Sequence, residues 1–145
     1  MNDKPPLYAG FIGTWVLIPE SCQYEQGPPP RSGTYRIEAS DDDQLDFFMD
    51  WIDHEGSARS ASFGGKADGS RVPFPGGELA DAFSIEPVSP RELNSRAFYR
   101  GVERMVAQRQ LDEHGVAMRV TQLVRLPGGE SLANVSIYRK KPLPS

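Results

Sequence analysis

The chain offers few side chains that could hold a metal ion or a haem. It contains two histidines, His54 and His114, and one cysteine, Cys22. His114 lies in the turn-forming stretch Asp-Glu-His-Gly, where a solvent-exposed position is expected, and no spacing pairs either histidine with Cys22 as a zinc site requires. His54 falls on the outward-facing set of its predicted strand, whereas an axial haem ligand would have to face inward. We therefore expect no metal and no cofactor.

Nucleophilic catalysis has equally little support. The sequence has no Gly-x-Ser-x-Gly elbow, although a Ser-His-Asp triad assembles in space and so stays open. Nothing beside Cys22 would lower the pKa of its thiol. The acidic run 41–43 lacks the spaced ligands of a calcium loop, and the glycine pairs at 64–65 and 76–77 precede neither a Lys-Ser pair nor a helix. These stretches are typical of turns, and we assign no catalytic residue.

Composition and charge narrow the class of protein. The 145 residues are 38% hydrophobic and 25% charged, which suits one folded domain spanning 1–145. Residues 91–145 hold ten Lys/Arg and five Asp/Glu, but the net charge is −4 and no basic-aromatic cluster indicates nucleic-acid binding. The first ten residues have no signal-peptide layout, and no run approaches the roughly 20 apolar residues that cross a bilayer. With a single cysteine, we expect a cytoplasmic protein without a membrane segment.

Turn signals punctuate the chain, and the segments between them have strand composition. The 14 glycines and 13 prolines favour many turns, and no segment shows a convincing helical period. Short strands at hairpin spacing predict an all-β fold, an up-and-down antiparallel β-barrel of about 8–10 strands. The predicted strands are 12–18, 33–39, 45–53, 58–63, 79–86, 92–99, 102–111, 116–125 and 132–140.

Alternation along these strands predicts a partly wet interior. In 45–53, Leu45, Phe47, Met49 and Trp51 oppose a set that contains two aspartates, so the first set is expected inside. The segments 102–111 and 132–140, in contrast, have no cleanly apolar face. A dry core does not tolerate such strands, whereas a barrel around a partly polar cavity does. The inward face of both segments stays open.

Gly13 and Trp15 form a Gly-x-Trp motif on the first predicted strand. With the alternating strands that follow, this motif resembles the lipocalin and calycin superfamily, in particular single-domain bacterial lipocalin-like proteins and, more distantly, fatty-acid-binding proteins. The resemblance implies that Trp15 closes one barrel end beneath an arginine from near the end of the chain. Arg139 is the first candidate for that arginine and Arg125 the second. The residues suited to plug this end are Leu7, Tyr8 and Phe11.

The sequence also departs from the fatty-acid-binding proteins. Those proteins insert two helices after the first strand, where this chain has a proline-rich loop that is expected to be stiff and extended. Their last strand often carries Arg-x-Tyr, which grips a ligand carboxylate. The matching positions here are Ser136 and Tyr138, so the tyrosine is present and the arginine is not.

The predicted function is binding of a small hydrophobic or amphipathic ligand inside the barrel. Arg104, if it faces inward, would favour an anionic head group. The expected lining comprises Leu17, Tyr35, Phe47, Met49, Trp51, Phe83, Tyr99, Arg104, Gln108, Met118, Val120, Gln122 and Tyr138.

Two other functions stay open. A calycin-type isomerase, cyclase or decarboxylase would need a Tyr/Arg cluster in the cavity, for which Tyr99, Arg104 and Tyr138 are the candidates. A homodimer with a packed interior would instead use an apolar outer surface. The outward apolar positions that could form it are Thr14, Val16, Ile18, Phe48 and Ile52.

Overall fold

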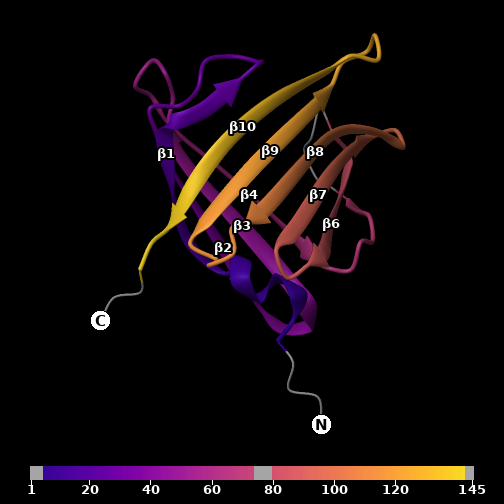
Figure 1. Cartoon of the computed structure of the whole chain (residues 1–145). Helices are drawn as coiled ribbons and strands as arrows, with labels where there is room; N and C mark the ends of the chain where they lie inside the picture. The colour runs from indigo at the N-terminus through magenta and orange to yellow at the C-terminus, as the bar shows by residue number, and fades with distance from the viewer. Residues whose placement is uncertain (1–4, 74–79, 143–145) are drawn as a thin grey trace.

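The computed structural model describes residues 5–73 and 80–142, and in them the chain is all-β (Figure 1). Ten antiparallel strands form one sheet in the order β4-β3-β2-β1-β10-β9-β8-β7-β6-β5. Strands that follow one another in the chain are neighbours, except β4 and β5 at the two ends of the order, and β1 pairs with β10, so the predicted up-and-down arrangement is confirmed. The strands are β1 (Gly13–Tyr24), β2 (Ser32–Ala39), β3 (Gln44–Ile52), β4 (Ala58–Lys66), β5 (Val72–Pro73), β6 (Ala82–Ser89), β7 (Glu92–Tyr99), β8 (Val102–Leu111), β9 (Ala117–Arg125) and β10 (Ser131–Lys140).

The sheet curls into a nearly closed barrel (Figure 1). β4 and β6 touch without forming a ladder, and Gly65 of β4 packs so closely on Phe83 of β6 that a Cβ there would lie 3.0 Å from the ring. The sequence predicted nine strands and missed β5, because two residues are too few to show alternation. The predicted strand 79–86 starts outside the described residues, and the observed β6 runs on to Ser89. The described residues contain no α-helix, only the short 3-10 helices η1 (Leu7–Phe11) and η2 (Asp41–Asp43).

β1 runs further than its apolar stretch predicts. Its pairing with β10 shifts register between Ile18 and Gln23 and then continues to Tyr24. The chain beyond is held to β10 by Asn134, whose Oδ1 accepts hydrogen bonds of 3.0 Å from the backbone N–H groups of both Glu25 and Gln26. Part of the expected loop is therefore strand, and the proline segment begins only after the residues that Asn134 holds.

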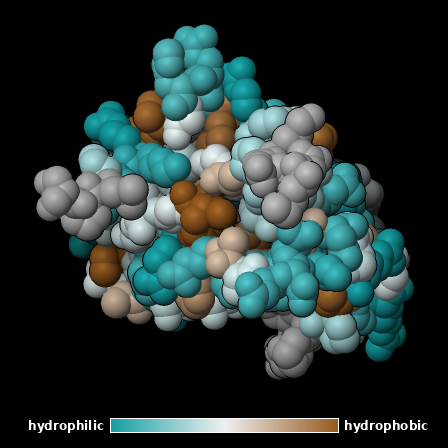
Figure 2. Space-filling view, turned by 90° about the horizontal axis from the view of Figure 1, so that it is seen from below, coloured by the Kyte–Doolittle hydropathy of each residue, from teal (hydrophilic) through white to brown (hydrophobic). Residues whose placement is uncertain are grey.

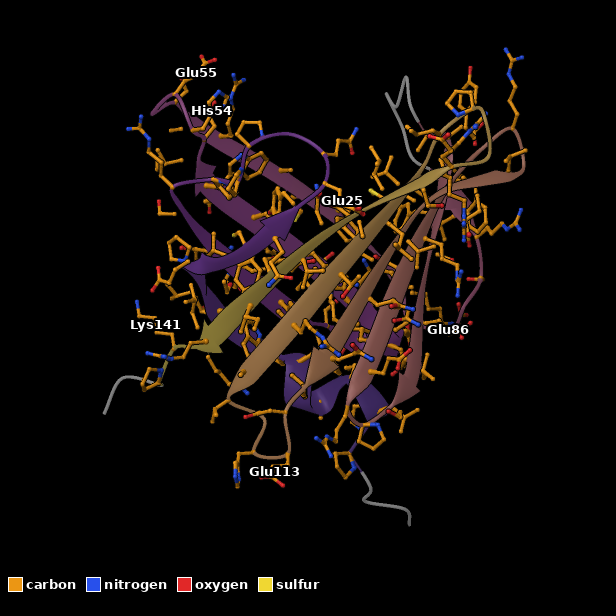
Figure 3. All side chains as sticks on the ribbon, turned by 45° about the horizontal axis from the view of Figure 1, so that its top comes forward. Glu25, His54, Glu55, Glu86, Glu113 and Lys141 are labelled. Carbon is orange, nitrogen blue, oxygen red and sulfur yellow. The ribbon has the colours of Figure 1, made fainter. Side chains whose placement is uncertain are left out.

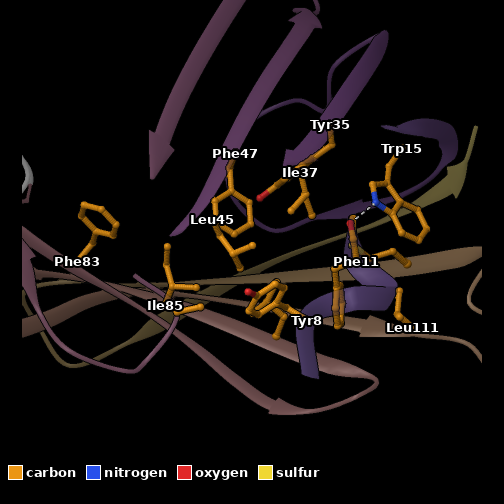
Figure 4. Close-up of a cluster of buried hydrophobic side chains, with 13 residues drawn as sticks. Tyr8, Phe11, Trp15, Tyr35, Ile37, Leu45, Phe47, Phe83, Ile85 and Leu111 are labelled. Atoms are coloured by element: carbon orange, nitrogen blue, oxygen red, sulfur yellow. Dashed lines mark hydrogen bonds between the residues drawn. The ribbon is translucent and has the colours of Figure 1, made fainter. Parts of the chain in front are cut away.

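One end of the barrel is closed by η1. Trp15 and Phe11 are fully buried, and the Trp15 indole Nε1 donates a 3.0 Å hydrogen bond to the Phe11 carbonyl (Figure 4). Tyr8 is also buried, whereas Leu7 is 44% exposed, so two of the three expected plug residues pack inward. Seen from below, this end gathers apolar residues near its middle and surrounds them with hydrophilic ones (Figure 2). Trp15 thus anchors the dry part of the interior.

The cation over Trp15 is a lysine, which corrects the expectation for Arg139. Trp15 pairs with Lys140 across β1 and β10, and the Lys140 ammonium lies 5.4 Å from the indole centroid. Arg139 is next to it in sequence, so the strand alternation turns its side chain outward, where it is exposed. Gly13, at φ 141°, leaves room for this lysine, because a Cβ would lie 3.0 Å from Lys140 Cε.

We predict that Tyr8→Phe destabilises the protein by about 2 kcal/mol, because the Tyr8 hydroxyl donates a 2.7 Å hydrogen bond to the Asp43 carboxylate. Burial, followed by Asp43, raises the pKa of Tyr8 from 10.0 to about 12, so the neutral phenol stabilises the fold below pH 10 and this contribution is lost as the pH rises through 12. In urea unfolding, the free energy of unfolding of the wild-type protein should exceed that of Tyr8→Phe, and the difference should narrow as the pH rises from 10 to 12. Tyr99→Phe, at a hydroxyl for which the structure shows no hydrogen bond, is the matched control; equal losses in the two variants would contradict the assignment.

Candidate functional site

Arg109 lies inside the barrel. The alternation of β8 turns Met105, Ala107 and Arg109 toward the interior, and the Arg109 side chain is only 1% exposed. Its Nε donates to the Tyr35 hydroxyl at 3.0 Å, and its Nη2 donates to the Ser95 hydroxyl at 3.0 Å. Three strands, β2, β7 and β8, therefore converge on one guanidinium group.

The charge of Arg109 has no acidic partner. None of the ion pairs that the structure shows within residues 5–73 and 80–142 includes it. Its neighbours are the Tyr35 and Ser95 hydroxyls, the Leu93 carbonyl, which accepts a 3.5 Å hydrogen bond from Nη1, and the Phe47 ring, whose centroid lies 4.7 Å from Cζ. Arginine stays protonated even when it is buried, and an uncompensated buried charge is costly. Because the Tyr35 and Ser95 hydroxyls act as acceptors for Arg109, their own protons are available to a guest.

Arg109 belongs to the wall of a chamber of about 150 Å³. Aromatic and sulfur-containing side chains and a few polar groups share its wall. The lining residues are Tyr24, Tyr35, Met49, Phe63, Ser95, Met105, Ala107, Arg109, Val120, Gln122, Asn134, Ser136 and Tyr138. We call this space the inner chamber.

A second, more open space of about 470 Å³ adjoins it. This outer chamber reaches Trp51 and the proline segment, through Pro28 and Pro30. The two chambers adjoin at a set of residues that line both, which we call the neck, and Arg109 lines only the inner chamber. The residues that line both are Tyr24, Met49, Phe63, Met105, Gln122 and Tyr138.

The tyrosines at the neck are neutral hydrogen-bonding groups. Burial is the main cause that raises the pKa of Tyr138 above its ordinary value, and the neighbouring Tyr24, Tyr35 and Cys22 add to it. Burial also raises the pKa of Tyr24. The Cys22 thiol has its pKa raised by burial and then by Glu20, which makes it a poor nucleophile.

The structure brings together about half of the predicted lining residues. Tyr35, Met49, Val120, Gln122 and Tyr138 line the inner chamber, and Trp51 lines the outer one. Leu17, Phe47 and Met118 are buried residues that line neither chamber. Phe83 borders a separate small pocket of about 60 Å³ between β4 and β7.

Three predicted residues lie elsewhere. Arg104 and Gln108 line neither chamber, because β8 presents its odd-numbered residues to the interior and its pairing with β7 shifts register beside Arg104. Tyr99, at the end of β7, is covered by Arg100 at 5.3 Å from its ring centroid and also lines neither chamber. The Tyr99, Arg104 and Tyr138 cluster expected for an enzyme is therefore not assembled in the cavity.

The predicted lining left out Arg109, Ser95, Tyr24, Met105 and Phe63. The signal for Arg109 was weak, because both faces of 102–111 carry one arginine. Pairing decides between them: Ala107 lies opposite Ser95 on β7 and Gln122 on β9, and both of these face the interior.

The other candidate sites remain at the surface. His54 and Glu55 point away from the barrel at the β3–β4 turn (Figure 3). Within the described residues no group of three His, Cys, Asp or Glu side chains could hold a metal ion. On the outer face, Arg36 lies between Thr14 and Phe48 and covers the Phe48 ring at 4.5 Å, so the expected apolar patch is interrupted.

Comparisons with known proteins identify the fold. No protein-family model matches the sequence, and no curated protein matches it. Among solved structures, wild-type fluorescent protein UnaG has 16% identity and a TM-score of 0.59, covering 92% of this chain and 99% of its own. The Schistosoma mansoni fatty-acid-binding protein in complex with arachidonic acid has 14% identity and a TM-score of 0.56, over 94% of this chain and 100% of its own.

A zebrafish ileal bile-acid-binding protein complexed with cholic acid also matches, with 14% identity and a TM-score of 0.54, over 92% of this chain and 100% of its own. The fold is therefore the up-and-down β-barrel of these structures, and the structural similarity extends over almost the whole chain. In the part of the chain that the structure describes, no helix is long and apolar enough to span a bilayer.

We predict that Arg109→Met leaves the stability of the ligand-free protein unchanged or raises it by about 1 kcal/mol. Removing a buried charge without a counter-ion offsets the loss of its hydrogen bonds to Tyr35 and Ser95. Urea denaturation of protein stripped of ligand measures the effect, with Arg104→Met on the same strand as the control. A loss above about 2 kcal/mol for Arg109→Met would show that the guanidinium serves the fold itself.

Proposed function

We propose that this barrel binds a small amphipathic molecule with one anionic group, which Arg109 holds at the inner end of the cavity. The observation that carries the proposal is the fully buried Arg109 guanidinium, which has no acidic partner within residues 5–73 and 80–142. An anionic guest would supply the missing countercharge through charge-assisted hydrogen bonds. The hydroxyl protons of Tyr35 and Ser95 would complete its coordination.

The rest of the cavity suits the apolar part of such a guest. Its walls are mostly aromatic and aliphatic, with a few convergent polar groups, which is the usual composition of a small-molecule site. The outer chamber gives the guest a path from solvent past Trp51 and the proline segment to Arg109.

The structural neighbours support the same class of ligand. Two of them hold arachidonic acid and cholic acid, which are both apolar molecules with one carboxyl group. Because these neighbours share only 14% identity with the chain, they support a ligand class and leave the ligand itself open. The single cysteine suits the reducing cytoplasm, which we propose as the location of the protein.

Two dyes of nearly the same shape test the role of Arg109. We predict that the anionic dye 1-anilinonaphthalene-8-sulfonate binds the wild-type protein, and that Arg109→Met weakens its binding at least about tenfold, a loss of about 1.4 kcal/mol. For the uncharged analogue N-phenyl-1-naphthylamine, Arg109→Met should change the dissociation constant less than about twofold. Fluorescence titration measures both dissociation constants.

Arg104→Met is the matched control, because Arg104 lies on the same strand but lines neither chamber. It should leave both dyes unaffected. If both variants lose the same affinity for the anionic dye, Arg109 acts only through the overall charge of the protein, and the proposed contact is wrong. No binding of either dye by wild-type protein would overturn the cavity proposal as a whole.

The two tryptophans provide a second test. Trp51 lines the outer chamber, whereas Trp15 is buried at the closed end. We predict that an apolar anion entering the cavity changes the fluorescence of Trp51, so that Trp51→Phe removes most of the ligand-induced change. If the response survives in Trp51→Phe and disappears in Trp15→Phe, the ligand binds at the closed end.

A further inference from the structure

A row of rings in contact borders the inner chamber, and three of them, Tyr35, Phe63 and Tyr138, line it directly. Tyr138 and Tyr35 meet edge to face with centroids 5.6 Å apart, and Tyr35 and Phe47 do so at 6.2 Å. Phe47 stacks on Phe63 at 4.5 Å, and Phe63 meets Phe83 at 5.8 Å. The rings form an unbroken row across β10, β2, β3, β4 and β6. Such a row offers a further ring the edge and face contacts that aromatic groups prefer, worth about 0.5–1.5 kcal/mol each.

The other side of the chamber presents small and aliphatic groups beside Met105, Arg109 and Gln122. Ser95, Ala107 and Val120 belong to β7, β8 and β9, which lie in front of β2, β3 and β4 (Figure 1). The space between the two sides, about 150 Å³, is the size at which an apolar protein cavity accommodates one benzene ring. Arg109 borders this space, so a ring placed there carries its acid group within reach of the guanidinium.

A flexible alkyl chain fits this space less well. With its carboxylate at Arg109, an extended chain would fill the chamber after a few carbons and then have to continue through the neck. Each methylene group that curls up inside loses rotational freedom, whereas a rigid ring has little to lose. The neck residues Met49 and Met105 also favour a ring, because thioether sulfur contacts aromatic groups favourably.

We propose that the acid bound by this barrel is a compact aromatic carboxylate, whose ring occupies the inner chamber between the aromatic row and Ala107. This proposal rests on the function proposed above and specifies its ligand class. A second planar group, if the ligand has one, would lie beyond the neck in the outer chamber against Trp51.

Acids of equal carbon number test the proposal on wild-type protein. Benzoate is compared with heptanoate, and 2-naphthoate with undecanoate, by isothermal titration calorimetry. Each aromatic acid should bind at least about tenfold tighter than its alkyl counterpart, a difference of about 1.4 kcal/mol. Benzyl alcohol is the uncharged control for benzoate and should bind weakly.

A pair of alanine-to-leucine variants locates the ring. Ala107 lines only the inner chamber, and Ala61 lines the outer one. Ala107→Leu should abolish benzoate binding, because it fills the space for the ring, whereas Ala61→Leu should leave benzoate affinity within about twofold. Equal effects of the two variants on benzoate would place the ring outside the inner chamber and overturn the proposal.

The outcomes separate the ligand class from the general function. If alkyl acids bind as tightly as aromatic acids, and both bind better than benzyl alcohol, the aromatic proposal is wrong and the anion-binding function stands. If the alcohol binds as tightly as benzoate, Arg109 does not select for an anion and the function proposed above is wrong. If none of the acids binds, both proposals are overturned, and because the panel uses unaltered protein, this result does not depend on whether a variant folds.

Discussion

A strand in a nearly closed barrel turns every second side chain inward, and on β8 this rule places a guanidinium group in the interior. Met105, Ala107 and Arg109 face the cavity because β8 is paired on both sides, with β7 and β9. A shift of one residue would send Arg109 to solvent and bring Gln108 inside. The character of the cavity, its charge and its polar contacts, therefore depends on the register of a single strand.

The closed end of the barrel is packed with apolar side chains, whereas the interior beyond it contains a buried charge. At the closed end, η1 and Trp15 fill the interior with packed apolar side chains, and the polar atom of the indole is satisfied by the Phe11 carbonyl. Further in, the rings of Tyr35 and Phe47 belong both to this core and to the surroundings of Arg109. The apolar core therefore fixes the positions of Tyr35 and Phe47, which contact the buried guanidinium of Arg109.

In the cavity, the buried charge of Arg109 is surrounded by neutral groups. Hydroxyl groups, a backbone carbonyl and rings stabilise the Arg109 cation only partly, so the ligand-free state carries an electrostatic cost that a bound anion would remove. The hydrogen bonds of Asn134 to residues 25 and 26 hold the start of the proline segment beside β10. Tyr24, Pro28 and Pro30 therefore border the outer chamber in a defined arrangement.

The sequence by itself determined the class of fold and the closed end. Turn residues and period-two alternation were sufficient for nine of the ten strands, and the segment 45–53 showed its buried face because two aspartates mark the other one. The resemblance that Gly13 and Trp15 carry identified this end, and of the three plug residues that it implied, Tyr8 and Phe11 are buried whereas Leu7 is exposed. Six of the predicted lining residues also line the chambers: Met49 and Trp51 lie on a strand that alternates clearly, whereas the inward face of the strand of Tyr138 was open.

Only the tertiary structure decided which charged residues face inward. Both faces of 102–111 carry one arginine, so composition could not separate Arg104 from Arg109, and the ladders with β7 and β9 did. In the same way the pairing of β1 with β10, and not the type of residue, placed Lys140 rather than Arg139 over Trp15. The physical reason is common to both cases: alternation sets the spacing of inward residues along a strand, but only hydrogen-bonded pairing with its neighbours sets the phase.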